Sequence, residues 1–225
     1  MDADKKRQLI AEAVLKKIAS VQVLGVGTGR MLNVFISHLS QAFRSGHLDL
    51  RYAIASSLET EKRLQAAGIP VQPFNQSDPV ELYIDGADEV DALGYVLKGG
   101  GGALLREKIL AHAAQEFWVL VEDKKMVKAL GAFPLACEVL PWARSFVARS
   151  IFKLGARAVY RENFITDQGH CILDVHDWPL APYHEKSQIL QNIPGLLEHG
   201  LFVQEKPKQV FVSDGVTVDC RSFAL

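Results

Sequence analysis

The chain has 225 residues, of which 48% are apolar and 23% are charged, and its formal net charge is −1. This composition is ordinary for a globular protein, and the charge leaves no excess of positive groups to attract a nucleic acid. The cysteines Cys137, Cys171 and Cys220 are far apart and odd in number, which argues against a disulfide framework or a zinc site and favours a reducing compartment.

The N-terminal segment is predicted to form an amphipathic helix over residues 4–19, because its apolar residues recur at helical spacing between charges. That pattern differs from a signal peptide, and no apolar run approaches transmembrane length. The basic residues Lys5, Lys6 and Arg7 are predicted to lie on the solvated face of this helix. We therefore expect a cytoplasmic protein with neither a membrane nor a nucleic-acid partner.

Strand-like and helix-like segments alternate in the first half of the chain. Strands are expected over 21–26, 51–56, 69–74, 81–89, 95–102 and 117–123. Helices are expected over 31–43, 58–68 and 103–117. This alternation predicts an α/β fold with a mostly parallel sheet and helices on both faces, in which ligands bind beyond the carboxyl ends of the strands.

From about residue 131 the alternation becomes less regular, which indicates a small α+β domain. Helices are expected over 145–156 and 184–195, and strands over 199–204, over 209–220 and on both sides of the turn at 167–169. We expect the last strands to return to the first sheet. The predicted division is a Rossmann-like domain of residues 1–130 plus about 206–225, and a smaller domain of residues 131–205.

The segment GVGTGR at 25–30 is a glycine-rich turn between a strand and a helix. A dinucleotide fingerprint would place its third glycine at position 30, which is Arg30, so that motif is not met. The backbone N–H groups of such a turn still favour a phosphate at the helix N-terminus. A tight turn without a ligand fits the residues equally well.

Two further segments carry weaker signals for phosphate binding. In ASSLET at 55–60, the hydroxyls of Ser56 and Ser57 either bind phosphate oxygens or cap the following helix. Lysines 124, 125 and 128 follow a predicted strand, where they either meet a phosphate or begin a solvated helix.

The segment DGADEVD at 85–91 places Asp85 and Asp88 three residues apart after a strand. Carboxylates in such a turn bind Mg²⁺ or Ca²⁺, or they handle protons on sugar hydroxyls. The complete EF-hand pattern is absent, and a solvated Asp-Gly turn is the plain alternative.

The sharpest local signal is LKGGGGALLREK at 97–108. Glycines at positions 99–102 let the backbone approach a ligand closely, and their N–H groups precede a helix that begins near Ala103. Lys98 adds a positive charge, and Glu107 adds a carboxylate early in the helix. These groups suit the removal of a proton next to a carbonyl, although Glu107 taken alone fits a surface carboxylate.

Together these segments resemble the ribose-5-phosphate isomerase A family along nearly the whole chain. The combination of DGADE at 85–89 with KGGGGALLREK at 98–108 is highly specific for this family. The resemblance also covers GVGTG at 25–29, ASSLETEKRLQAAGI at 55–69 and KKMVKALGAFPLACEVLPWARSFVAR at 124–149. It implies a Rossmann-like main domain, a small ferredoxin-like α+β domain, and a homodimer or homotetramer.

The resemblance implies an enzyme that interconverts D-ribose 5-phosphate and D-ribulose 5-phosphate in the pentose phosphate pathway, with no metal or other cofactor. By motif position, Glu107 would be the general base, while Lys98 and the amides of Gly99, Gly100, Gly101 and Gly102 would stabilise the enediolate. Asp85 would assist ring opening and hydroxyl proton transfer, and Asp88 would bind sugar hydroxyls. Gly27, Thr28, Gly29, Ser56, Ser57 and Lys125 would hold the phosphate. We expect burial to shield Glu107 while Lys98 keeps it from protonating fully.

The chain departs from this family at the phosphate end. The family usually continues GTG with two small hydroxyl residues, whereas this chain has Arg30 and Met31. Arg30 either replaces the hydroxyls with a charge-assisted contact or points into solvent. Leu58 and Glu61 stand where a small acidic residue and a hydroxyl are commoner, and a carboxylate there would repel a phosphate.

Three alternatives remain open at this point. One is a sugar-phosphate sensor without catalysis, although the chain has only about twenty residues before its first strand, too few for a DNA-binding helix-turn-helix. Another is an isomerase of a different sugar phosphate that Arg30 accommodates. The third is a metal-dependent hydrolase built on Asp85 and Asp88, which a chelator would inactivate.

Overall fold

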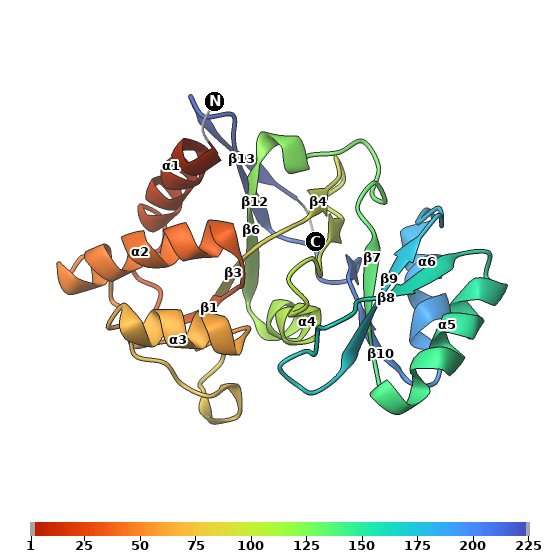
Figure 1. Cartoon of the computed structure of the whole chain (residues 1–225). Coiled ribbons are helices and arrows are strands. Elements are labelled where there is room, and N and C mark those ends of the chain that lie inside the picture. Colours follow the sequence, from red (N-terminus) through yellow and green to blue (C-terminus); the bar gives the residue numbers. More distant parts are fainter. Residues whose placement is uncertain (1–2, 224–225) are drawn as a thin grey trace.

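A computed structural model describes residues 3–223 of the chain (Figure 1). Its main feature is a six-stranded sheet in the order β13-β12-β6-β3-β1-β2. The strands are β1 (Val23–Val26), β2 (Tyr52–Ala55), β3 (Leu82–Gly86), β6 (Glu116–Glu122), β12 (Gln209–Ser213) and β13 (Val218–Ser222). All neighbours pair in parallel except β12 and β13, so the prediction of a mostly parallel sheet is confirmed.

Helices cover both faces of this sheet (Figure 1). On one face lie α1 (Ala3–Leu15), α2 (Arg30–Arg44) and α3 (Leu58–Ala66), which bury a core that includes Ile10, Phe35 and Leu64. On the other face, α4 (Leu104–Ala113) lies between the large sheet and the rest of the chain. A second core, which includes Tyr83 and Phe117, fills this side.

A separate antiparallel sheet, in the order β10-β7-β9-β8, forms the smaller part of the molecule. Its strands are β7 (Leu135–Val139), β8 (Arg157–Tyr160), β9 (Cys171–His176) and β10 (Leu196–His199). Helices α5 (Arg144–Lys153) and α6 (Tyr183–Gln191) pack on its outer face (Figure 1). The predicted α+β character is confirmed.

The distribution of strands supports the predicted division of the chain. All strands between positions 135 and 199 belong to the small sheet, and β12 and β13 return to the large one. A third sheet of short strands, β4 (Glu89–Val90), β5 (Val96–Leu97) and β11 (Leu201–Phe202), lies where the two parts meet. We keep 1–130 plus about 206–225, and 131–205, as the proposed domains.

Several predicted elements differ from the structure. The strand expected over 209–220 is the antiparallel pair β12 and β13, and the helix expected over 184–195 ends at Gln191. Residues 69–74 form a single bridge from Val71 to Ala53 instead of a strand, because Pro70 and Pro73 lack the N–H group that a ladder needs. The helix expected to reach residue 117 ends at Ala113, since the chain from 116 onward joins β6. The strand expected over 95–102 is limited to β5, because the glycines after it turn.

Among the described residues, no helix combines the length and the apolar character needed to cross a bilayer.

One backbone contact joins the small sheet to the chain beside β5. Gly200 donates its N–H to the Ala136 carbonyl at 2.8 Å and accepts the N–H of Lys98 at 2.8 Å. A Cβ at position 200 would overlap the Lys98 carbonyl oxygen, which belongs to the backbone and cannot rotate away. The position therefore requires glycine for reasons of space.

We expect Gly200→Ala to lower the free energy of unfolding by about 1–3 kcal/mol, because the added methyl group must displace backbone. Urea denaturation measures this change. Gly101→Ala is the matched control, since a Cβ there meets no heavy atom within 4 Å, and its stability should stay within about 0.5 kcal/mol. Equal stabilities of the two variants would contradict the steric argument.

Candidate active site

A cavity of about 440 Å³ opens at the carboxyl ends of β1, β3 and β6, where the fold class predicts ligand binding. Segments from distant parts of the sequence meet there, among them the turn after β1, the turn after β3, the glycine run after β5 and the chain after β6. Of the predicted site residues, the lining contains Thr28, Gly29, Arg30, Asp88, Lys98, Gly99, Gly100, Gly101, Glu107 and Lys125.

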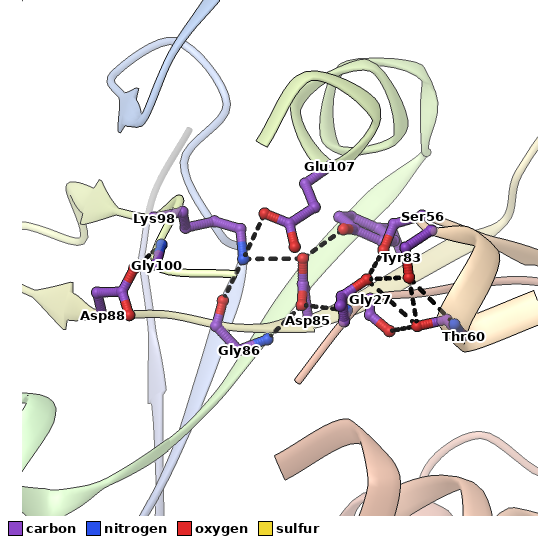
Figure 2. A network of polar contacts seen from close by, with 12 residues as sticks. Gly27, Ser56, Thr60, Tyr83, Asp85, Gly86, Asp88, Lys98, Gly100 and Glu107 are labelled. Carbon is purple, nitrogen blue, oxygen red and sulfur yellow. Dashed lines mark hydrogen bonds and ion pairs between the residues drawn. The ribbon is translucent and has the colours of Figure 1, made fainter. Parts of the chain in front are cut away.

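The ammonium group of Lys98 is the centre of the site (Figure 2). Its Nζ atom lies 2.8 Å from Oδ2 of Asp85 and 3.3 Å from Oε2 of Glu107, and it donates to the Gly86 carbonyl at 2.6 Å. Only 4% of the Lys98 side chain is exposed. Burial alone would lower the pKa of Lys98, but the carboxylates of Asp85 and Glu107 beside it raise that pKa, so Lys98 stays charged.

Glu107 reaches the cavity from the beginning of α4. The side chain is buried, and its pKa is raised to about 8, with burial as the largest cause. The charge of Asp85 contributes to this rise, whereas the ammonium group of Lys98 opposes both effects. The predicted shielding of Glu107 is therefore present, and the carboxylate is tuned to take up and release a proton near neutral pH.

Asp85 lies behind Lys98 and not in the lining of the cavity. It is completely buried, and it accepts hydrogen bonds from the Tyr83 hydroxyl and from the N–H groups of Thr28 and Gly86. These donors and the Lys98 ammonium compensate its negative charge, which burial would otherwise make costly. A Cβ at position 27 would overlap this carboxylate, which explains why Gly27 is glycine although it does not line the cavity.

Asp88 and the glycine run form the wall opposite β1. Oδ2 of Asp88 accepts the N–H of Gly100 at 2.8 Å (Figure 2). Gly99 has φ 112°, a value that favours glycine. Gly102 does not line the cavity, because it faces the ring of Phe164, which a Cβ at position 102 would overlap. Its conformation serves the packing of the loop rather than contact with a ligand.

The serine segment is placed differently from the prediction that it holds phosphate. Ser56 and Ser57 are buried, and their hydroxyls bond the hydroxyl of Thr28 at 2.7 and 2.8 Å. Ser57 also accepts the N–H of Thr60 and caps α3, which was the structural alternative. In this structure both serines support the turn after β1, and they lie outside the cavity lining. Glu61 lines a different hollow, so its charge does not face the cavity.

The end of the cavity beyond Lys98, here called the cationic end, is lined by Arg7, Arg30 and Lys125. The carboxylate of Glu122 lines it too, but it is paired with Arg7 and Lys124. Arg30 begins α2, and Lys125 lies beyond β6 with its ammonium group 5.8 Å from the centre of the Phe133 ring. Among the described residues, no ion pair of the Arg30 guanidinium is present. An anion there would also meet the N-terminus of α2 after Gly29, whose φ is 115°.

Arg7 is a cavity residue that the sequence analysis missed. It was predicted on a solvated helix face, but its side chain is 11% exposed and lines the cavity. Its guanidinium group bonds Glu122 and Asp4, each at 2.7 Å. The prediction was wrong because α1 packs beside β6 and brings residue 7 to the end of that strand, a contact across 115 positions. No local signal in the sequence marks it.

Among residues 3–223, no group of three or more His, Cys, Asp or Glu side chains could hold a metal ion. The carboxylates of Asp85 and Glu107 are instead bridged by the ammonium group of Lys98. The site therefore suits chemistry in which an amine and backbone amides stabilise negative charge.

Comparisons with known proteins agree with this geometry. A family model described as ribose 5-phosphate isomerase A (phosphoriboisomerase A) matches residues 52–215. Ribose-5-phosphate isomerase A of Legionella pneumophila (strain Lens) is 44% identical over 209 residues, which cover 93% of this chain and 95% of that protein.

Two solved structures share the fold. Ribose 5-phosphate isomerase A from Neisseria gonorrhoeae superposes with a TM-score of 0.93 at 30% identity, covering 100% of this chain and 99% of that one. A D-ribose-5-phosphate isomerase in complex with phospho-erythronic acid has a TM-score of 0.94 at 29% identity, covering 99% of this chain and 100% of that one. The chain belongs to the ribose 5-phosphate isomerase A family.

Proposed function

We propose that this protein is an aldose–ketose isomerase that interconverts D-ribose 5-phosphate and D-ribulose 5-phosphate through an enediolate. The observation that carries the proposal is the convergence of Lys98 and Glu107 on one cavity, with Nζ and Oε2 3.3 Å apart. A base whose pKa lies near the working pH is efficient in general base catalysis, and Glu107 has this property. Family membership supports the same reaction.

In the proposed mechanism, ionised Glu107 takes the proton from C2 of the open-chain aldose. The electrons of that C–H bond form the C1–C2 double bond, and negative charge develops on the oxygen at C1. Lys98 and the amides of the glycine run stabilise this charge, because they are fixed donors in a partly desolvated cavity. Glu107 then returns its proton to C1, while a proton moves from the oxygen at C2 to the oxygen at C1.

Asp88 and Asp85 take different parts in this proposal. Asp88 lines the cavity, and in this proposal it binds sugar hydroxyls. Asp85 is completely buried behind Lys98, so we expect it to act through that ammonium group, 2.8 Å away. Its predicted assistance to ring opening and hydroxyl proton transfer remains a prediction, exerted on the substrate by way of Lys98.

The phosphate is proposed to occupy the cationic end of the cavity. Thr28, Gly29 and Arg30 lie at the N-terminus of α2, and Lys125 and Arg7 line the same space. Arginine binds phosphate bidentately, so Arg30 can supply donors where the family usually has hydroxyl side chains. Ser56 and Ser57 contribute indirectly, by holding Thr28.

The remaining parts of the proposal concern the context of the enzyme. We propose a metal-independent, cytoplasmic enzyme of the pentose phosphate pathway that assembles as a homodimer or homotetramer. The sensor and the hydrolase receive no support from a particular contact in the structure. An isomerase of another sugar phosphate differs from the proposal only at the phosphate end and is an outcome of the assay below.

A direct conversion assay with ribose 5-phosphate, with and without EDTA, tests the reaction. We expect conversion to ribulose 5-phosphate that EDTA leaves unchanged. Glu107→Gln should lower kcat by about 10²–10⁴-fold, since a positioned acid–base group contributes that much. Its circular dichroism spectrum should match that of the unaltered chain, because glutamine has nearly the same shape.

Other phosphorylated aldoses serve as the substrate control in this assay. Faster turnover of one of them would assign the protein to a different sugar phosphate. Binding without any turnover would support the sensor, and release of inorganic phosphate that EDTA abolishes would support the metal-dependent hydrolase. Appreciable turnover by Glu107→Gln would show that this carboxylate is not the base.

The pKa of Glu107 predicts how the reaction depends on pH. The base must be ionised, and its pKa is raised to about 8, so the rate should fall as pH falls through 8. Between pH 7 and pH 9, kcat/KM should rise by about tenfold, the change in the ionised fraction of such a group. Initial rates across this range test it, and a flat profile would contradict the assignment.

Arg30→Ala should raise KM for ribose 5-phosphate by about tenfold or more, because a hydrogen bond to a charged group contributes roughly 1.5–3 kcal/mol. We expect kcat to change little, since Arg30 lies away from Glu107. The control is Arg44→Ala at the opposite end of α2, where Arg44 bonds the Ala67 carbonyl. An unchanged KM in Arg30→Ala would mean that Arg30 does not contact the phosphate.

A further inference from the structure

The glycine run is held from behind by a residue of the small sheet. Arg161 directly follows β8, and its Nη1 atom donates to the carbonyl oxygens of Gly99 at 3.1 Å and Gly100 at 3.3 Å. Its Nε and Nη2 atoms bond the carboxylate of Asp174, on β9, at 2.9 and 2.5 Å. The Arg161 backbone N–H also bonds the Ile172 carbonyl. The guanidinium group is therefore anchored before it meets the glycines.

This contact sets the direction of two peptide groups, and for the Gly99 carbonyl it acts together with the N–H of Gly102, which donates to the same oxygen at 3.0 Å. In a trans peptide, the carbonyl of one residue and the N–H of the next point in opposite directions. Because the Gly99 and Gly100 carbonyls point to Arg161, the N–H groups of Gly100 and Gly101 point the other way. The Gly100 N–H does meet Asp88, and both glycines line the cavity while Arg161 does not. Arg161 thus helps to turn the Gly100 amide toward Asp88, which accepts it, and the Gly101 amide toward the cavity and the proposed substrate.

Glycine makes such an anchor necessary. Without a Cβ, each of these residues has access to conformations on both sides of φ 0°, so a peptide group can rotate unless its carbonyl is held. Rotation would replace an N–H donor in the cavity by a carbonyl oxygen, which would repel a developing oxyanion. Phe164 completes the support, since its ring packs against Gly102 and lies 5.4 Å from the Arg161 guanidinium.

We propose that Arg161 is a positioning residue for catalysis. It acts through the Gly99 and Gly100 carbonyls, keeps the Gly100 amide on Asp88 and keeps the Gly101 amide turned toward the developing oxyanion, with Asp174 as its own anchor. This inference rests on the proposed isomerase function and extends it to the small sheet. According to this inference, residues after β8 and on β9 contribute to transition-state stabilisation although they do not touch the substrate.

The test compares Arg161→Met with Arg157→Met in the complete chain. Arg157 is the matched control because it begins β8, the strand that Arg161 directly follows, and it pairs with exposed Asp177 at 2.9 Å. We expect Arg161→Met to lower kcat by about ten- to hundred-fold with KM within about threefold, because misplaced catalytic groups cost rates of this order. Arg157→Met should leave both kcat and KM unchanged.

The affinities of two inhibitors distinguish a loss of amide positioning from a general disturbance of the site. Phospho-erythronic acid carries a carboxylate where the enediolate carries charge, so its affinity should fall along with kcat in Arg161→Met. Inorganic phosphate probes the cationic end alone, and its inhibition constant should stay unchanged. Addition of millimolar guanidinium to Arg161→Ala should restore part of kcat, whereas urea, which is uncharged and has a similar shape, should not.

Several outcomes would overturn the inference. One is a kcat of Arg161→Met within twofold of the unaltered chain. Another is a parallel loss of kcat and of affinity for both inhibitors, which indicates a structural role. If Arg161→Met does not fold, Asp174→Asn should show the same pattern to a smaller degree, and an unchanged kcat there overturns the inference. If the unaltered chain converts no ribose 5-phosphate, the proposed function is wrong, and this inference, which rests on it, is wrong as well.

Discussion

The buried ammonium group of Lys98 is the interaction on which the rest of the site depends. Asp85 and Glu107 are both buried, and two carboxylates so close together would be costly to keep in the fold without a positive charge between them. The ammonium group lies 2.8 Å from the Asp85 carboxylate and 3.3 Å from that of Glu107, so it offsets negative charge on both side chains. Because burial still dominates for Glu107, its pKa is raised to about 8, and the same electrostatic balance that permits the fold produces a usable base.

Backbone geometry places that charge and supplies its neighbours. Gly200 bonds the Lys98 N–H and leaves room for its carbonyl, and Gly27 leaves room for Asp85. The peptides of Gly99 and Gly100 are held through their carbonyls by Arg161. The glycines thus act in two ways: some leave room for a neighbouring group, while others expose their amides to the cavity. Glycines of the second kind need their peptide groups held in place, and Arg161 of the small domain does this.

The two ends of the cavity use different physical means. At the reacting end, donors and carboxylates are buried and hydrogen-bonded, so their geometry is set before a substrate arrives. At the cationic end, Arg30 is exposed and Arg7 is tied to Glu122. Charge on flexible side chains tolerates more variation than a reacting centre does. The resemblance stated above predicts the same contrast, with a departure at position 30 and matching motifs around Lys98 and Glu107.

Local patterns in the sequence determined the alternating strands and helices and the mostly parallel sheet, because hydrophobic periodicity and glycines at strand ends are local signals. The resemblance to a known family predicted that Lys98, Asp88 and Glu107 meet, and all three line the cavity. Only the tertiary structure decided which residues face the cavity. It turned Ser56 and Ser57 toward Thr28, buried Asp85 and brought Arg7 to Glu122. Arg161 likewise reaches the glycines across about sixty positions. Such contacts depend on how distant elements pack against one another, which composition and periodicity do not predict.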